Sequence, residues 1–303
     1  MHMPMLQTES IETEGLVLRG RYLVLGVPLE IACASAQAFA RADETYAAFR
    51  QSQAAQPAFG ALVERSGAAA YRVADTRGYA REWADEQAAT IDLLDRIVHG
   101  VLAELYQRGI YAIHAGAVVG PQGALLIAGR SGQGKTTLVL GMLRNGFGLL
   151  SDEFAVAEPA SQRLLPYRRS IHIRPGTPEL IPELAFVADR PQVRLGGGIE
   201  WTLTPDDLAR AFPGCLAEAA PLRGVLLLDG APRPGAEPAI TPLPAALATI
   251  ELLRGTWAVS QDFGGGLARL GALLSGVPCA RLRAGKLSST VAQIAGWLEA
   301  PNA

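Results

Sequence analysis

Cysteine is scarce in this chain of 303 residues. The three cysteines, Cys33, Cys215 and Cys279, lie far apart and show no spacing typical of a metal site or a redox pair. A sparse, odd set of this kind argues against a disulfide framework and favours a reducing compartment. The small secreted proteins that depend on disulfides are therefore excluded as a class.

The sequence also lacks a basic tract and a long apolar run. The formal net charge is -2 and the sequence pI is about 6.1, which gives no indication of a nucleic-acid-binding surface. No uninterrupted apolar stretch is long enough to cross a bilayer, and residues 1–15 lack a basic segment followed by an apolar core. We therefore expect a cytoplasmic protein with no nucleic-acid partner and no membrane partner.

One glycine-rich run has a specific pattern. Residues 129–136 read GRSGQGKT and match G-x-x-x-x-G-K-[ST] in full. The apolar stretch ALLIAG precedes this phosphate loop, and TTLVLGMLRNG follows it with leucines at helical spacing. A strand, a glycine-rich loop and a helix form the context in which the pattern binds a nucleoside triphosphate. The expected contacts are Gly129, Arg130, Ser131, Gly132, Gln133, Gly134, Lys135, Thr136 and Thr137.

The residue types of this loop suit a bound phosphate. Glycines permit backbone conformations that turn several amides inward, and the helix adds its positive N-terminal end. Lys135 can reach the outer phosphates, and the hydroxyl of Thr136 can ligate magnesium. We therefore expect ATP and Mg²⁺ as cofactors, with GTP left open because contacts to the base leave no local motif.

The chain divides into two parts joined by a helix. Residues 1–81 predict a small α+β domain that could dock a substrate. Residues 82–109 carry apolar residues at helical spacing and predict a bridging helix. Residues 110–303 predict an α/β domain with a mixed sheet around the phosphate loop, in which YAIHAGAVV and ALLIAG form a hairpin. Within it, the glycines at 264–266 indicate a linker between helices.

Two acids follow the next apolar strand. Phosphoryl transfer needs a carboxylate to hold the metal and often one to accept the proton of the attacking hydroxyl. Asp152 and Glu153 are the candidates. A strand paired beside the loop strand would bring them to the terminal phosphate, and adjacent strand residues point to opposite faces, which predicts separate roles. A solvated strand end is the alternative.

The order HAGAVV, GRSGQGKTTL and GFGLLSDE resembles the HPr kinase/phosphorylase family and its relatives over residues 114–153. The resemblance implies a phosphate-loop core similar to that of phosphoenolpyruvate carboxykinases, and transfer to a serine hydroxyl. It implies that Asp152 is the general base and that Glu153 helps to hold magnesium together with Asp152 and Thr136. It places His114 at the head of the hairpin, near the phosphates or the acids; a structural histidine is the alternative.

The sequence departs from this family at two points. Glu153 stands where the family usually has aspartate, and the glycine- and arginine-rich signature that accompanies HPr recognition and phosphorolysis is absent. Related kinases without the signature phosphorylate serine on precursor peptides of natural-product pathways. The resemblance therefore implies a peptide or protein acceptor, and it allows a homo-oligomer.

Two further features have two interpretations each. Residues 166–176 hold Arg168, Arg169 and Arg174, which could clamp a phosphate or an acidic substrate, or could lie in a solvated loop. Asp229 ends the apolar run VLLLDG, as metal-binding aspartates do in many ATPases, but Asp-Gly is a common turn, and we favour the turn.

Three functions compete. An ATP-dependent kinase that phosphorylates a hydroxyl, in the first place serine of a peptide or protein, accounts for the loop and the acids together. A nucleotide switch or ATPase that uses water would carry a clear metal-binding strand and a water-positioning residue, and neither is convincing. A carboxykinase-type enzyme would need a longer chain and a second metal site. The kinase is the function that the sequence predicts.

Overall fold

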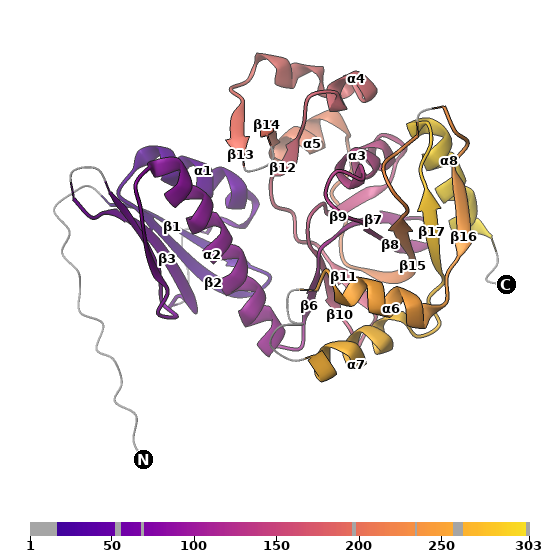
Figure 1. Ribbon diagram of the computed structural model, residues 1–303, viewed down its shortest axis with the longest axis horizontal. Coiled ribbons are helices and arrows are strands. Elements are labelled where there is room, and N and C mark those ends of the chain that lie inside the picture. The colour runs from indigo at the N-terminus through magenta and orange to yellow at the C-terminus, as the bar shows by residue number, and fades with distance from the viewer. Residues whose placement is uncertain are drawn as a thin grey trace.

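The computed structural model describes residues 17–51, 56–67, 70–195, 198–233, 235–256 and 263–300. Over these residues the chain forms three sheets with helices packed on them, which confirms the expected α/β class with a mixed sheet. Figure 1 shows the N-terminal sheet and its helices at one end of the molecule and the large sheet at the other. No helix in the described part of the chain combines the length and the apolar character needed to cross a membrane.

The N-terminal sheet has five strands in sequence order. They are β1 (Leu18–Val24), β2 (Val27–Cys33), β3 (Phe59–Arg65), β4 (Tyr71–Asp75) and β5 (Ala80–Trp83). Only β2 and β3 pair in parallel, because α1 (Ala36–Tyr46) and the short η1 (Ala47–Phe49) connect them. The strands bury alternate residues against α1 and α2 (Glu86–Gln107), so both helices cover the same face of the sheet.

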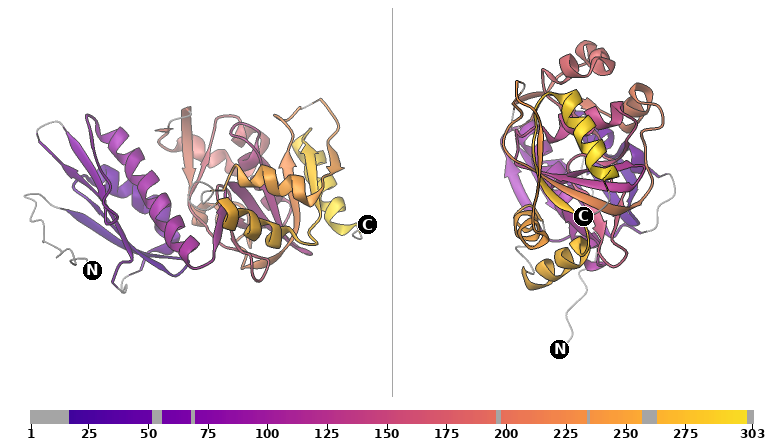
Figure 2. Two further views of the ribbon diagram at one scale, coloured as in Figure 1. Left: turned by 60° about the horizontal axis from the view of Figure 1, so that its bottom comes forward. Right: turned by 90° about the vertical axis from the view of Figure 1, so that its right-hand side faces the viewer.

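The helix predicted between the two parts is present as α2. It packs on the N-terminal sheet, on the side that faces the rest of the molecule in Figure 2, and its last turn leads into the first strand of the large sheet. We call β1 to α2 the N-terminal lobe. Its core also includes Val156 and Tyr167 from the large-sheet side, so the two halves of the molecule share buried contacts.

The large sheet has nine strands. Seven of them lie in the order β6-β10-β11-β15-β8-β7-β9, with β17 beside β15 and β16 beside β17. Their bounds are β6 (Tyr111–Ile113), β7 (Ala115–Gly120), β8 (Gly123–Ala128), β9 (Gly148–Ser151), β10 (Ala155–Glu158), β11 (Arg163–Leu165), β15 (Ala220–Leu228), β16 (Ala239–Pro242) and β17 (Cys279–Arg283). The predicted hairpin is confirmed, since β7 and β8 pair antiparallel with Gly120 opposite Gly123.

Helices cover both faces of the large sheet. Leu125 and Ile127 of β8 pack on one face with α3 (Lys135–Arg144) and α8 (Leu287–Glu299). Leu126 packs on the other face with α6 (Ala245–Leu253) and α7 (Phe263–Leu274). A parallel strand covered on both faces is apolar throughout, and this accounts for the unbroken run ALLIAG. The glycines at 264–266 lie inside α7, so the predicted linker is wrong at this point.

A small three-stranded sheet lies between the N-terminal lobe and α3 (Figure 1). It contains β12 (Ile171–Ile173), β13 (Val193–Leu195) and β14 (Gly198–Leu203), in the order β12-β14-β13. The segments around it are α4 (Thr177–Leu180), the 3-10 segment η2 (Pro182–Asp189) and α5 (Pro205–Ala211). Arg190 anchors η2 on α5, because its guanidinium donates to both oxygens of Asp207 at 2.6 and 2.7 Å.

Candidate active site

The phosphate loop lies between the end of β8 and the start of α3. Gly134 precedes the helix with φ 83°, and Gly132 has φ 80°, a left-handed conformation that side chains disfavour. Gly129 leaves no room for a side chain, because a Cβ atom there would lie 2.7 Å from Gln133 Oε1. That same oxygen accepts a hydrogen bond from the Arg130 amide at 2.6 Å, which closes the loop on itself. The motif is therefore folded as a phosphate loop must be.

Lys135 reaches back across this loop. Its ammonium group donates to the carbonyl of Gly129 at 2.6 Å and lies 3.5 Å from the carbonyl of Arg130. Burial lowers the pKa of Lys135, while the nearby Asp152 and Glu153 counteract that effect. The cation thus stands at the mouth of the loop, where it can meet the outer phosphates of a nucleotide.

Asp152 and Thr136 are brought together. The Thr136 hydroxyl donates to Asp152 Oδ2 at 2.9 Å, while Oδ1 is buried and has no hydrogen-bond partner among the described residues. Burial raises the pKa of Asp152 to about 7; Glu153 adds to the rise, and the Thr136 hydrogen bond and Lys135 oppose it. A carboxyl group in this range is suited to accept a proton near neutral pH.

The strand that delivers Asp152 is not the neighbour expected from the sequence. β9 pairs with β7, so one strand separates it from β8. The contact still forms because α3 lies across β7 at Gly116, where a Cβ atom would be 2.7 Å from Val139 Cγ2 and 3.5 Å from the Asp152 carbonyl. The missing side chain at Gly116 lets α3 sit close enough for Thr136 to reach Asp152.

Glu153 is more exposed than Asp152 and has a different charged neighbour. Its side chain is 52% exposed, and its Oε2 lies 3.4 Å from Nη1 of Arg169. Both acids line the same cavity, because they follow β9 at a bend instead of alternating along the strand, and the prediction of opposite faces is wrong. The hydroxyl of Thr136 is bonded to Asp152, so the structure brings this acid, and not Glu153, to the expected magnesium position.

A magnesium ion fits this arrangement in part. Mg²⁺ in nucleotide sites takes one or two protein oxygens and fills its remaining positions with phosphate oxygens and water. Thr136 Oγ1 and the Asp152 carboxylate supply such a pair. Over the described residues, no group of three or more His, Cys, Asp or Glu side chains is placed to hold a metal without a nucleotide.

His114 lies directly before β7, between the loop and the acids. Its amide donates to the carbonyl of Gly255 at 2.8 Å, and its ring meets Phe154 edge-on with centroids 5.6 Å apart. Burial lowers the pKa of the imidazole, Lys135 lowers it further, and Glu153 acts in the opposite direction. A neutral ring at this place can donate or accept one hydrogen bond without adding charge.

The three arginines of residues 166–176 have separate positions. Arg168 donates to the carbonyl of Ala217 and lies 3.1 Å from Glu218, away from the loop. Arg169 and Arg174 line the cavity. Arg174 pairs with the buried Glu200 at 3.0 Å. Arg168 therefore has no part in a phosphate clamp in this conformation, whereas Arg169 and Arg174 are placed to contribute.

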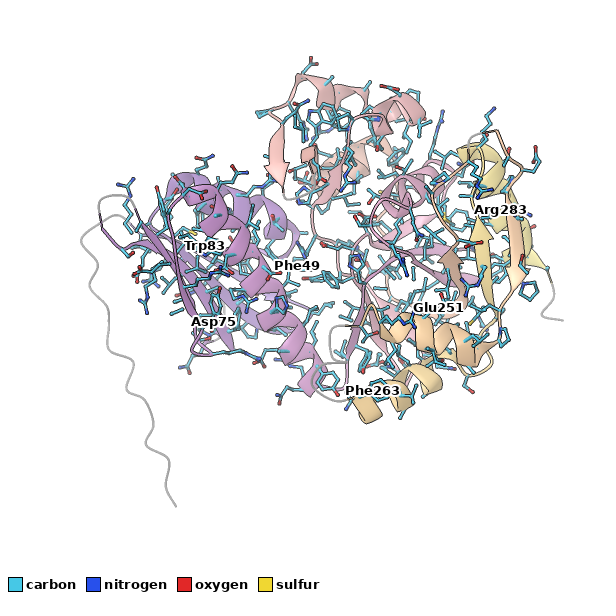
Figure 3. All side chains as sticks on the ribbon, in the orientation of Figure 1. Phe49, Asp75, Trp83, Glu251, Phe263 and Arg283 are labelled. Carbon is cyan, nitrogen blue, oxygen red and sulfur yellow. The ribbon has the colours of Figure 1, made fainter. Side chains whose placement is uncertain are left out.

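Arg169 is held by the N-terminal lobe. Its side chain is only 12% exposed, and its guanidinium carbon lies 5.3 Å from the ring centre of Tyr46, the last residue of α1. The neighbouring Ser170 donates from its hydroxyl to the Glu44 carbonyl at 2.6 Å and from its amide to the Thr45 carbonyl at 3.2 Å. Figure 3 shows Phe49 pointing into the same junction, where its ring lies 5.9 Å from that of Tyr167.

A second contact joins α1 to the small sheet. Nη1 of Arg41 donates to the Thr202 hydroxyl at 2.8 Å, and that hydroxyl lies 3.4 Å from His172 Nδ1. The sequence gives no signal for the roles of Arg41 and Tyr46, because more than a hundred residues separate them from the segments that they hold. The only sequence feature that marks them is a pattern of arginine and aromatic residues near one end of a helix, and such patterns are also common on protein surfaces.

These residues enclose one cavity of about 630 Å³ (the nucleotide cavity). Its volume lies within the range of small-molecule sites. Of the residues predicted from the sequence, it is lined by His114, Arg130, Ser131, Gly132, Gly134, Lys135, Thr136, Thr137, Asp152, Glu153, Arg169 and Arg174. Gly129 and Gln133 line a neighbouring cavity instead. Arg168 lines neither of the two cavities.

No family model matches the sequence. No curated protein matches it either. Among solved structures, the HPr(Ser) kinase/phosphatase from Coxiella burnetii is similar to this chain with 13% sequence identity and a TM-score of 0.31. The match covers 62% of this chain and 99% of that one. A likeness of this size leaves the function to be argued from the site itself.

Proposed function

We propose that this protein is an ATP-dependent kinase that transfers the terminal phosphoryl group to a serine hydroxyl of a peptide or protein. The observation that carries the proposal is the pair formed by Thr136 and Asp152. One carboxylate oxygen is bonded to the loop hydroxyl at 2.9 Å, and the other is buried and unpartnered. The free carboxylate oxygen can accept the proton of an attacking hydroxyl, which phosphorylation of an alcohol requires.

The residues have distinct roles in this proposal. The loop amides and Lys135 would bind the phosphates, and Thr136 and Asp152 would hold Mg²⁺, which would neutralise phosphate charge. The acceptor hydroxyl gives its proton to Asp152 Oδ1. Its oxygen bonds to the terminal phosphorus as the bond from that phosphorus to the bridging oxygen breaks, and ADP leaves with the electron pair. Arg169 stabilises charge on the transferred group from the opposite wall of the cavity.

The substitution Asp152→Asn tests the assigned base. It keeps the shape of the side chain but removes the proton-accepting oxygen, so transfer to a serine-centred peptide library should fall by about 10²- to 10⁴-fold. Affinity for a non-hydrolysable ATP analogue, measured without Mg²⁺, should change little, because the loop is intact. The measurement is radiolabel incorporation from ATP, with nucleotide binding followed by calorimetry.

Asp189→Asn is the matched control, since Asp189 is exposed at the end of η2 and lines neither cavity. This variant should transfer phosphate as the unchanged protein does. Transfer by Asp152→Asn at the unchanged rate would show that another group takes the proton.

A further inference from the structure

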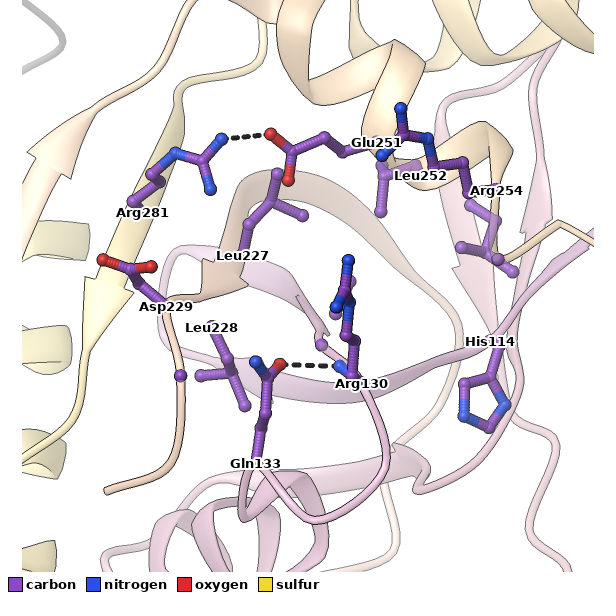
Figure 4. A pocket seen from close by; sticks show the side chains of 15 residues that line it. His114, Arg130, Gln133, Leu227, Leu228, Asp229, Glu251, Leu252, Arg254 and Arg281 are labelled. Atoms are coloured by element: carbon purple, nitrogen blue, oxygen red, sulfur yellow. Dashed lines mark hydrogen bonds and ion pairs between the residues drawn. The ribbon is translucent and has the colours of Figure 1, made fainter. Parts of the chain in front are cut away.

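A second cavity of about 570 Å³ adjoins the nucleotide cavity at the ends of β8 and β15 (Figure 4). We call it the flanking cavity. Its lining includes the apolar residues Ala128, Leu227 and Leu252. Its walls carry charged side chains from four segments of the chain, and Figure 4 shows that of Arg130 rising into the space between Asp229, Glu251 and His114.

The position of the flanking cavity relative to the loop distinguishes it from a nucleotide site. The nucleotide cavity is lined by most of the loop, up to Thr137, whereas the flanking cavity touches only Gly129, Arg130 and Gln133. That end of the loop is where Lys135 lies on the Gly129 carbonyl and where a terminal phosphate would be. His114 and Arg130 line both cavities, so the two spaces meet beside the group to be transferred.

The charges of the flanking cavity favour an acidic ligand. Arg281 and Glu251 form an ion pair across it and so neutralise each other. The guanidinium groups of Arg130 and Arg254 have no hydrogen-bond or ion-pair partner among the described residues, and Asp229 is the one remaining carboxylate on the wall. Arg130 and Arg254 both line the flanking cavity, and a free guanidinium group is suited to a carboxylate, which arginine can bind in bidentate geometry.

Arg254 is also connected to the site of transfer. The next residue, Gly255, accepts the hydrogen bond from the His114 amide at 2.8 Å. A ligand bound on Arg254 would therefore lie against the segment that positions the His114 ring. A peptide bound on Arg254 would therefore lie within a few residues of the nucleotide cavity.

We propose that the flanking cavity docks the acceptor peptide through acidic residues next to its serine. The carboxylates bind Arg254 and Arg130, and the serine enters the nucleotide cavity past His114. This inference rests on the proposed kinase function and specifies its substrate class: a serine with aspartate or glutamate close to it in the sequence.

The test is equilibrium capture of a degenerate peptide library with a fixed central serine, in the presence of Mg²⁺ and a non-hydrolysable ATP analogue. The bound peptides should be enriched in Asp and Glu at one or two positions beside the serine. Arg254→Gln should weaken binding of an enriched peptide by about tenfold, the loss of one charge-assisted contact. Arg283→Gln is the control, because Arg283 is exposed on β17 and lines neither cavity, and it should leave binding unchanged.

The outcomes separate the docking site from the kinase function. Absence of bound peptides, a bound set without acidic enrichment, or equal losses in the two variants would overturn the docking proposal. So would a loss of nucleotide affinity in Arg254→Gln alone, which would place the nucleoside in the flanking cavity. Acidic peptides that bind through Arg254 but accept no phosphate would leave the docking site standing and remove the kinase function.

Discussion

At the scale of single residues, the two oxygens of Asp152 are not equivalent. One is bonded to Thr136, and the other is buried without a partner. A buried polar atom without a partner is costly, and a catalytic role or a bound ion is one reason for a folded protein to retain it. The sequence could predict Asp152 and the loop residues because local motifs carry them. It could not predict that Glu153 turns to Arg169, since a bend after β9 decides this.

His172 gives a test at neutral and mildly acidic pH. Burial, with Arg41 and Arg169 nearby, lowers the pKa of His172 to about 3 from the ordinary value of 6.5. Below pH 6.5 the unfolded chain binds a proton that the folded chain does not, so stability falls as pH drops toward 3. Between pH 7 and pH 5 the loss from this group is about 2 kcal/mol.

The measurement is urea unfolding of the unchanged protein and of His172→Gln at both pH values. Between pH 7 and pH 5, His172→Gln should lose about 2 kcal/mol less stability than the unchanged protein. Equal losses in the unchanged protein and in His172→Gln would show that His172 titrates normally.

At the scale of elements, the close approach of α3 to β7 decides whether the site forms. The predictions of the hairpin and of the helix after the phosphate loop are confirmed, because each depends on a local sequence pattern. The neighbour of β9 could not be read from the sequence, because strand order is set by packing across the whole sheet. The helix at Gly266 could not be read from the sequence either. Gly266 packs against Tyr111, where a Cβ atom would lie 2.4 Å from the phenolic oxygen.

Gly116→Ala tests this approach. The added Cβ would meet Val139 Cγ2 at 2.7 Å, so overpacking should cost about 1 to 3 kcal/mol of stability and move Thr136 from Asp152. Gly296→Ala is the control: it lies in α8 with nothing within 4 Å of its added Cβ and should stabilise by about 0.5 to 1 kcal/mol. Urea unfolding measures both. If Gly116→Ala left the free energy of unfolding unchanged, α3 would not be in tight contact with β7.

At the scale of the whole molecule, the N-terminal lobe contributes to the candidate site. Tyr46 lies against the guanidinium of Arg169, and carbonyls of α1 hold Ser170. The contacts join segments more than a hundred residues apart, so no local pattern could predict them. A lobe that holds a cavity residue can transmit its own binding events to the candidate site.

Tyr46→Leu should therefore lower the rate of transfer about tenfold, the size expected for a misplaced charge-stabilising residue, and leave nucleotide affinity unchanged. Tyr71→Leu replaces the same residue type on β4, away from the junction, and should affect stability alone. Single-turnover transfer to a library peptide compares the two. The same rate in both variants would show that the lobe does not support Arg169.

The central claim is that the group activated by Asp152 is an alcohol and not water. The most direct measurement is the fate of the label when the protein is incubated with γ-labelled ATP, Mg²⁺ and the serine-centred peptide library. We expect the label to appear as phosphoserine in peptides, and the release of free phosphate to be slow without them. Label that is released wholly as free phosphate, at a rate that peptides do not alter, would contradict it.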